Sequence, residues 1–264
     1  MSGVALVTGG SRGIGRALAA ALTRAGVDVA VTGRDAAALQ QVVDDGDAAL
    51  ALPGDAASPV DVAAAVAAAQ DRLGPLDLAV ANAGRFATGG VLWETDPDDW
   101  WRDVEVNLRG VALLAHASLP GMVARGQGRF VALGSGFGNA VTRHGSGYGV
   151  AKTAVHRLVE SLGDELAGTG VTAFTLSPGR VRTDMQLGFP EGFTTANPDF
   201  LVPPPGGYVP AEAVAGLLLR VARGELDPLT GRYLHVTTDL EAALASAPDP
   251  GHGDAGTLRL VPWT

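Results

Sequence analysis

Tyr148 and Lys152 stand four positions apart in the segment Ser-Gly-Tyr-Gly-Val-Ala-Lys. If this segment is helical, both side chains lie on one face, because positions i and i+4 are neighbours on an α-helix. A free phenol has a pKa of about 10, so a nearby ammonium that favours the phenolate would make Tyr148 a usable acid or base. The pair predicts proton transfer, although an isolated Tyr/Lys pair is equally consistent with a solvated helix surface.

A serine lies 13 positions before the tyrosine. Ser135 follows a predicted strand, so its hydroxyl can face the start of the next helix across a cleft. A hydroxyl in that place can polarise a substrate carbonyl while Tyr148 supplies the proton. With Ser135 included, a reaction centre is favoured over a solvated surface.

A glycine-rich turn near the N-terminus predicts that the chain binds a dinucleotide. It reads Thr-Gly-Gly-Ser-Arg-Gly-Ile-Gly from Thr8 to Gly15, after an aliphatic segment and before an Ala-rich one. Glycines let the backbone turn tightly and approach a pyrophosphate, which the free N–H groups of a helix N-terminus then bind. An ordinary strand-to-helix turn is the alternative. The expected cofactor contacts in the turn are Gly9, Ser11, Arg12, Gly13, Ile14 and Gly15.

The end of the second predicted strand indicates which dinucleotide is bound. Gly33 stands 20 positions after Gly13, where an acidic residue would bind the ribose 2′-hydroxyl of NAD. Arg34 follows instead, and together with Arg12 it would bind a 2′-phosphate through charge-assisted hydrogen bonds. Asp35 is expected to point away. We therefore expect NADP (NADPH), with the alternative that Arg34 is a solvated residue at the start of a helix.

Two further strand ends carry candidate cofactor contacts. Asp55, after the third strand, could accept a hydrogen bond from an adenine amino group. Asn82, Ala83 and Gly84 follow the fourth strand at the carboxyl edge of the sheet, where ligands bind. Taken singly, each is equally consistent with turn chemistry.

The elements that must position these residues alternate between aliphatic strands and Ala-rich helices. Continuous apolar strands separated by helices indicate an α/β fold, a doubly wound parallel sheet of the Rossmann type, formed by residues 1–238 as a single domain. The predicted strands are Val4–Thr8, Val27–Thr32, Ala48–Pro53, Leu78–Ala81, Gly128–Gly134, Val171–Ser177 and Tyr233–Thr237. The predicted helices are Gly15–Ala25, Ala36–Asp44, Val60–Leu73, Asp98–Arg125, Tyr148–Thr169 and Ala211–Arg223.

The regular alternation ends after Pro178. Residues 185–210 are rich in Gly, Pro and Phe, which predicts a substrate loop with at most short helices that orders as a lid. Residues 239–264 form a C-terminal extension with a helical piece and an extra strand expected at Thr257–Val261. Some side chains could supply an apolar wall, although aromatic loop residues often simply pack. They are Phe86, Trp93, Phe137, Met185, Leu187, Phe189 and Phe193.

Composition limits the class of protein. The 264 residues carry a net charge of −9, which disfavours nucleic acid as a partner, and have no apolar stretch long enough for a membrane span. There is no cysteine, which excludes disulfides and thiolate metal sites. The N-terminus has no basic segment, so we expect it to form a first strand and not a signal peptide. We expect a cytoplasmic enzyme that needs no metal.

Taken together, these motifs resemble the short-chain dehydrogenase/reductase family, in its subgroup with a single Rossmann domain. The resemblance extends from Met1 to about Tyr233 and includes the Thr-Gly-x-x-x-Gly-x-Gly turn, the Asn-Ala-Gly step and Tyr-x-x-x-Lys. It implies that Asn107 bends the long helix and holds a water in a proton relay to Lys152. It also implies that the segment from Pro178 to Thr183 binds the nicotinamide, with cofactor contacts from Pro178, Gly179, Val181 and Thr183.

The sequence departs from the family in two places. The usual Ile-Ser-Ser before the catalytic position is Leu133-Gly134-Ser135, which removes a neighbouring hydroxyl. The chain also lacks the usual Asp-Gly-Gly ending and continues for about thirty further residues, which puts the standard subunit packing in question.

The function implied is that of an NADPH-dependent carbonyl reductase, or of the reverse alcohol dehydrogenase. Ser135, Tyr148, Lys152 and Asn107 would be catalytic, with Tyr148 and Lys152 also contacting the cofactor. The alternatives are an NAD-dependent dehydrogenase of the same fold and a non-catalytic NADP-sensing protein.

The assembly expected is a homodimer or homotetramer, because the resemblance implies pairing of the two long helices around a two-fold axis. Apolar residues are expected on more than one face of these helices, leaving a patch for a partner. They are Val111, Leu114, Leu119 and Met122 on the first helix and Val155, Leu158, Val159 and Leu162 on the second. Two alternatives remain for the C-terminal extension: it swaps into a neighbour and reinforces the second interface, or it covers that interface and stops assembly at the dimer.

Overall fold

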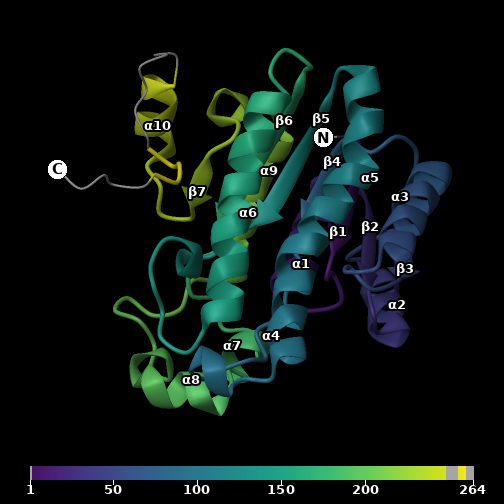
Figure 1. Cartoon of the computed structure of the whole chain (residues 1–264). Coiled ribbons are helices and arrows are strands. Elements are labelled where there is room, and N and C mark those ends of the chain that lie inside the picture. Colours follow the sequence, from purple (N-terminus) through teal and green to yellow (C-terminus); the bar gives the residue numbers. More distant parts are fainter. Residues whose placement is uncertain (1, 248–254, 260–264) are drawn as a thin grey trace.

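A seven-stranded sheet, parallel throughout, forms the centre of the computed structural model, which describes residues 2–247 and 255–259 (Figure 1). Its order is β3-β2-β1-β4-β5-β6-β7, so the predicted doubly wound sheet is confirmed. The strands are β1 Val4–Thr8, β2 Asp28–Gly33, β3 Leu50–Pro53, β4 Leu78–Ala81, β5 Gly128–Leu133, β6 Val171–Ser177 and β7 Tyr233–His235.

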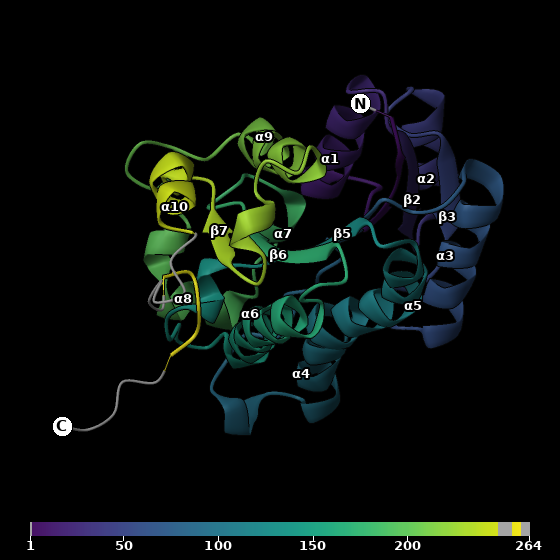
Figure 2. The same ribbon diagram turned by 90° about the horizontal axis from the view of Figure 1, so that it is seen from above.

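Helices cover both faces of the sheet, which is why the central strands are apolar along their whole length. One layer contains α1 Gly13–Arg24, α2 Ala36–Asp44 and α9 Ala211–Ala222. The other contains α3 Pro59–Leu73, α5 Gly110–Arg125 and α6 Ser146–Glu165. Figure 2 shows α1 and α9 on one side of the sheet and α5 and α6 on the other.

The strand order reverses between β1 and β4. The chain moves from β1 outward to β3, then returns to place β4 on the other side of β1. In parallel sheets, such a reversal leaves a crevice at the carboxyl ends of the strands, where ligands bind. The glycine turn after β1 and the Asn-Ala-Gly step after β4 therefore meet at this crevice.

The single helix predicted for Asp98–Arg125 is wrong in one respect. The structure has α4 Pro97–Val104, a π-helical turn (η2) at Glu105–Arg109, and then α5. The buried Asn107 side chain lies in that turn and donates a hydrogen bond to Asp103 O at 2.7 Å. A side chain that bonds main-chain carbonyls competes with the regular helical ladder, and a π-turn is the usual result of one extra residue.

Residues 185–210, called the lid below, contain only short helices, as predicted. These are α8 Glu191–Ala196 and η4 Pro198–Phe200, preceded by α7 Asp184–Leu187 at the start of the lid. Figure 1 places α7 and α8 with α4 at one end of the sheet, and α10 at the opposite end.

The C-terminal segment folds back onto its own chain. Helix α10, Leu240–Ser246, packs against the core, and the main-chain N–H of Tyr233 on β7 donates to Gly256 O at 2.8 Å. The strand expected at Thr257–Val261 is absent from residues 257–259, and its last two residues lie outside the described part. The reason is that Leu258 and Arg259 turn toward α6, where Arg259 pairs with Glu160 at 2.5 Å.

The eight apolar side chains that the sequence named on α5 and α6 do not form the expected exposed patch. Seven of the eight side chains named for it are buried against the sheet, and the eighth, Leu158, is partly buried. Among the described residues, no helix combines the length and apolar character needed to cross a bilayer.

A glycine contact sets the distance between α6 and the chain that leads into β7. A Cβ at Gly163 of α6 would lie 2.5 Å from the Cα of Gly231, closer than atoms can approach. Gly216 in α9 offers a matched comparison, because a Cβ there meets nothing within 4 Å.

We predict that Gly163→Ala lowers the free energy of unfolding by about 1–3 kcal/mol, because the added methyl forces two backbones apart. Gly216→Ala should raise it by about 0.5–1 kcal/mol, since only the helix propensity changes. Urea unfolding of both variants measures the difference. Equal effects from the two substitutions would contradict the close contact.

Candidate active site

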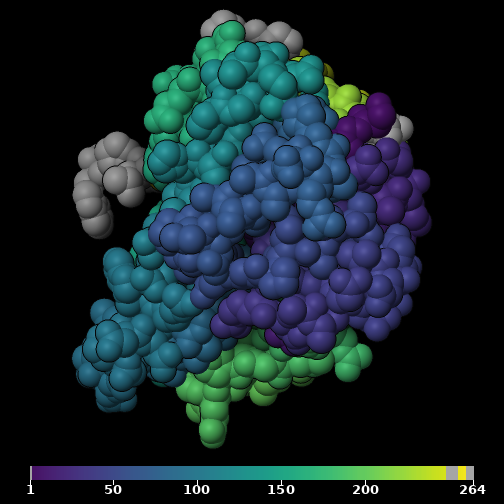
Figure 3. Space-filling view, turned by 90° about the vertical axis from the view of Figure 1, so that its right-hand side faces the viewer, coloured from purple at the N-terminus to yellow at the C-terminus, as the bar shows by residue number. Residues whose placement is uncertain are grey.

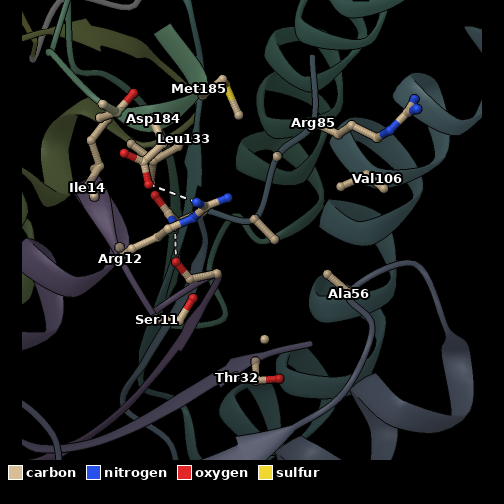
Figure 4. A pocket seen from close by; sticks show the side chains of 18 of the residues that line it. Ser11, Arg12, Ile14, Thr32, Ala56, Arg85, Val106, Leu133, Asp184 and Met185 are labelled. Atoms are coloured by element: carbon tan, nitrogen blue, oxygen red, sulfur yellow. Dashed lines mark hydrogen bonds and ion pairs between the residues drawn. The ribbon is translucent and has the colours of Figure 1, made fainter. Parts of the chain in front are cut away.

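A cleft along the carboxyl edge of the sheet is lined by most of the predicted cofactor contacts and by Tyr148 and Lys152 (Figure 4), whereas Ser135 and Asn107 are not part of its lining. The glycine turn and Arg34 line it at one end, and Tyr148, Lys152, Pro178 and Thr183 at the other, with Asp55 and the Asn-Ala-Gly step also in its wall. The lining also includes residues that were not among the expected cofactor contacts. These are Thr32, Gly33, Gly54, Ala56, Arg85, Val106, Leu133, Gly134, Asp184 and Met185, of which the sequence had named Met185 only as a candidate for an apolar wall.

The glycine turn is held in shape by the Asn-Ala-Gly step. The Thr8 hydroxyl accepts hydrogen bonds from the N–H groups of Asn82 (3.0 Å) and Ala83 (3.1 Å). The Asn82 amide in turn donates to Thr8 O (2.9 Å) and Gly9 O (3.1 Å). Gly9 has φ +65°, and a Cβ there would lie 2.8 Å from Ala83 Cα. The Asn82 side chain therefore shapes the cleft from behind.

The N-terminus of α1 fits a cofactor phosphate. Arg12 is its N-cap residue, but no side chain caps the helix and its first turn contains no acidic residue. The first N–H groups of a helix have no partner within the helix and carry partial positive charge, which is the setting in which phosphates bind.

Both arginines that the sequence placed at a 2′-phosphate line the cleft. Arg34 lies beside Gly33, and the exposed Arg12 also forms an ion pair with Asp184 of α7 at 2.8 Å (Figure 4). Asp55 pairs with Arg102 and accepts from the N–H of Ala57 at 2.9 Å, so its carboxylate already has partners.

Ser135, Tyr148 and Lys152 meet where β5 ends against the first turns of α6. The Ser135 hydroxyl lies near enough to the Tyr148 hydroxyl to interact with it and to lower its pKa. The Lys152 ammonium lies 5.6 Å from the centre of the tyrosine ring, is almost fully buried, and donates to Leu133 O at 2.8 Å. The i, i+4 geometry expected from the sequence is thus present.

Burial changes the acidity of both groups. It raises the pKa of Tyr148 to about 12, although the Ser135 hydroxyl acts in the opposite direction. Burial lowers the pKa of Lys152 to about 8. Near pH 7 the site therefore contains a neutral phenol beside a protonated lysine whose pKa lies only slightly above the pH.

Asn107 and Asp103 hold the main chain beside the cleft. Asn107 donates to Arg85 O and accepts from Arg85 N at 3.3 Å. The fully buried Asp103 carboxylate accepts from Arg85 Nη1 at 2.6 Å and from Thr88 N at 2.9 Å. Sequence reasoning missed Asp103. Its signal was the i, i+4 spacing to Asn107, which puts both on one helix face.

His156 is a second residue that sequence reasoning missed. A Cβ at Gly134 would lie 2.8 Å from His156 Nε2, and one at Gly138 would lie 2.5 Å from His156 Cε1. The imidazole therefore fills the space that the two glycines on either side of Ser135 leave empty. Burial and the charge of Lys152 lower the pKa of His156 to about 4, so the ring is neutral.

Of the segment after β6, Pro178 and Thr183 line the cleft, whereas Gly179 and Val181 do not. Gly179 has φ +68°, and a Cβ there would lie 3.0 Å from Val209. Val181 is buried. The Thr183 hydroxyl accepts from Gln186 N at 3.4 Å and begins α7.

Comparison with known proteins gives a consistent result. Residues 3–191 match the family model described as short chain dehydrogenase. A short chain dehydrogenase of Pseudocercospora fijiensis is 34% identical, over 97% of this chain and 87% of its own. A 3-oxoacyl-[acyl-carrier-protein] reductase of Vibrio cholerae is 33% identical, over 88% of this chain and 95% of its own.

Solved structures agree with these relatives. The F189W actinorhodin polyketide ketoreductase, solved with NADPH, superposes with a TM-score of 0.82 at 31% identity, covering 90% of this chain and 97% of its own. A gluconate 5-dehydrogenase of Burkholderia cenocepacia, solved with NADP and tartrate, has a TM-score of 0.78 at 29% identity, covering 90% and 95%.

We predict that Lys152 loses its proton near pH 8 in the folded protein. Lys152 is the only lysine in the sequence, so isotope-labelled lysine gives a single side-chain NMR signal to titrate. The unfolded chain, with an ordinary lysine pKa, keeps the proton to higher pH, so the free energy of unfolding should rise as pH increases from about 8 toward 10.5. A folded-state midpoint above pH 10 would contradict the effect of burial.

Proposed function

The chain belongs to the short chain dehydrogenase family, and we propose that it is an NADPH-dependent carbonyl reductase, which in reverse acts as an alcohol dehydrogenase. Family membership supports oxidoreductase activity on alcohols or carbonyl compounds. The observation that carries the proposal is that Ser135, Tyr148 and Lys152 meet beside the cleft that begins at the glycine turn.

In the proposed reduction, the substrate carbonyl oxygen lies between the Ser135 and Tyr148 hydroxyls. The nicotinamide, when bound, supplies a hydride to the carbonyl carbon. Tyr148 gives its phenolic proton to the carbonyl oxygen as that oxygen becomes an alkoxide, and this completes the alcohol. A pKa of about 12 keeps the phenol protonated at neutral pH, and Ser135 hydrogen-bonds the phenolate that forms while the nearby Lys152 ammonium stabilises its charge.

The cofactor would lie along the cleft. We propose that the N–H groups of the glycine turn bind the pyrophosphate, that Lys152 contacts the nicotinamide ribose, and that Thr183 binds the carboxamide. Asn107 would complete a proton relay to Lys152 through a water. The roles of Lys152, Thr183 and Asn107 come from the family resemblance.

NADPH is preferred over NADH in this proposal because Arg34 stands where an acidic residue would otherwise contact the ribose. The NADPH and NADP complexes of the two structural neighbours support the same preference. We propose a different role in cofactor binding for Arg12. Its ion pair with Asp184 crosses the cleft over the expected place of the pyrophosphate, and it would hold either cofactor in place.

Self-association is proposed on the resemblance, which implies pairing through α5 and α6. The outer faces of these helices expose Val123 and Val150, at 40% and 52%. The segment 255–259 covers part of α6, so the extension would limit assembly and not swap into a neighbour. A single domain over residues 1–238 and a cytoplasmic location remain predictions from the sequence.

We predict that Tyr148→Phe lowers kcat for ketone reduction by about 10²–10⁴-fold and leaves NADPH affinity near that of the wild type, because only the proton donor is removed. Steady-state kinetics and NADPH titration measure the two effects. Tyr233→Phe, on β7, is the matched control and should retain activity. A Tyr148→Phe variant with more than about a tenth of wild-type kcat would rule out Tyr148 as the proton donor. Wild-type protein that binds NADPH but reduces no ketone would favour the sensing alternative.

We predict that Arg34→Ala weakens NADPH binding by about 10–100-fold and changes NADH binding little, since a charged hydrogen bond to the 2′-phosphate is lost. Arg12→Ala is the matched comparison, expected to weaken both cofactors about equally. Binding titrations with both cofactors decide the matter. A wild-type preference for NADH would move the assignment to the NAD-dependent alternative.

A further inference from the structure

We propose that the substrate is an uncharged ketone with an aromatic ring attached or fused beside its carbonyl. This inference rests on the proposed function and concerns the space on the substrate side of Tyr148. The sequence has seven phenylalanines, and the structure gathers five of them around that tyrosine. They are Phe86, Phe137, Phe189, Phe193 and Phe200, called the phenylalanine cluster below.

Two of these rings touch the proton donor. Phe86 stacks on Tyr148 with ring centres 4.9 Å apart and planes 11° from parallel. Phe137, two residues after Ser135, meets the same tyrosine edge-on, at 5.4 Å and 86°. A group attached to a carbonyl held by Ser135 and Tyr148 has to lie against these rings. The place occupied by Phe86 therefore has the geometry that a planar substrate ring would use.

The remaining three rings come from the lid. Phe193 is fully buried and lies 4.9 Å from Phe86 and 5.7 Å from Phe137, between ring centres. Phe200 lies 5.4 Å from Phe137, and Phe189 lies 5.2 Å from Phe86. These three rings complete the aromatic surface beside Tyr148, and in Figure 3 the green segment that contains the lid forms the lower edge of the molecule.

Arg180 fastens the lid in this position. Its guanidinium donates to the carbonyls of Phe200 and Val202, both at 2.9 Å, and lies 5.0 Å from the centre of the Phe200 ring. Because Arg180 stands between Pro178 and Thr183, the segment expected at the nicotinamide also holds the aromatic wall. Cofactor and substrate ring would therefore be enclosed together.

The cluster is not a continuation of the sheet core. The two apolar layers of the core are aliphatic apart from Phe130 and Phe174. Gly145 allows the rings to meet, since a Cβ there would lie 3.2 Å from Phe86 Cζ and 3.5 Å from Phe193. Aromatic residues are thus concentrated where the carbonyl must arrive.

The chemistry of this wall selects among ketones. A substrate ring can take over the stacked and edge-on contacts that the phenylalanines now make with one another. A polyhydroxylated or anionic substrate would lose water without gaining hydrogen bonds from these side chains, which disfavours its binding. A linear alkyl ketone gains burial of apolar surface, but not the ring contacts.

The test compares kcat/KM with NADPH for three ketones. They are α-tetralone, methyl octyl ketone with the same number of carbons, and a ketogluconate. In the wild type we expect α-tetralone to exceed each of the others by at least about tenfold. In Phe137→Leu the ratio of α-tetralone to methyl octyl ketone should fall about 3- to 10-fold, the range expected when an aromatic pair is lost. Trp101→Leu, an exposed aromatic outside the cluster, should leave the ratio unchanged.

Phe193→Leu is a second variant in case Phe137→Leu disturbs the Ser135 loop, and the rate with methyl octyl ketone reports whether either variant is intact. Equal or greater kcat/KM for methyl octyl ketone or the ketogluconate would overturn the aromatic substrate while leaving the reductase in place. Failure of all three ketones despite NADPH binding would overturn the proposed function itself.

Discussion

The arrangement of the site depends on an ammonium kept out of water. Lys152 has 3% of its surface exposed and donates to Leu133 O, so its charge can be there only if the end of β5 and the first turns of α6 are in place. Several contacts ensure this. His156 packs under the Ser135 loop, and Trp100 of α4 donates from Nε1 to Ser146 Oγ at 2.9 Å on the first turn of α6. Farther along, Gly163 lies directly on Gly231.

The same burial costs stability and creates reactivity. A buried cation without a carboxylate opposes folding, since water solvates the charge better than one carbonyl does. In the proposed reduction that charge would be useful near Tyr148, because desolvation would strengthen its effect on the phenolate. The charge of the fully buried Asp103, by contrast, is compensated by Arg85 and by main-chain N–H groups. Through these bonds Asp103 holds the loop after β4 in place.

Local patterns in the sequence predicted much of this molecule. Runs of apolar residues predicted the seven strands, and the spacing of Tyr148 and Lys152 predicted their common helix face. What the sequence could not show are contacts between distant segments, because no local periodicity encodes them. Arg12 and Asp184 are 172 positions apart, and no local pattern in the sequence indicates their ion pair.

Side-chain competition with the backbone was equally hidden. The spacing of residues around Asn107 predicts a continuous helix, and only the family resemblance implied a bend there; the bonds of Asn107 to Asp103 and Arg85 explain the π-helical turn. In the sequence, Gly134 stands out only because it replaces a serine of the family pattern. In the fold, the missing side chain leaves room that the His156 ring occupies.

The solitary lysine has a practical meaning for anyone who handles this protein. All other side-chain cations are arginines, so apart from the α-amino group the only amine is the buried one beside Tyr148. Acylating dyes, amine-directed cross-linkers and resin-coupling reagents therefore find no lysine handle on the surface. A reagent that does acylate an internal amine reports that α6 has moved away from β5, which makes covalent labelling a direct gauge of whether the catalytic end of the cleft is intact.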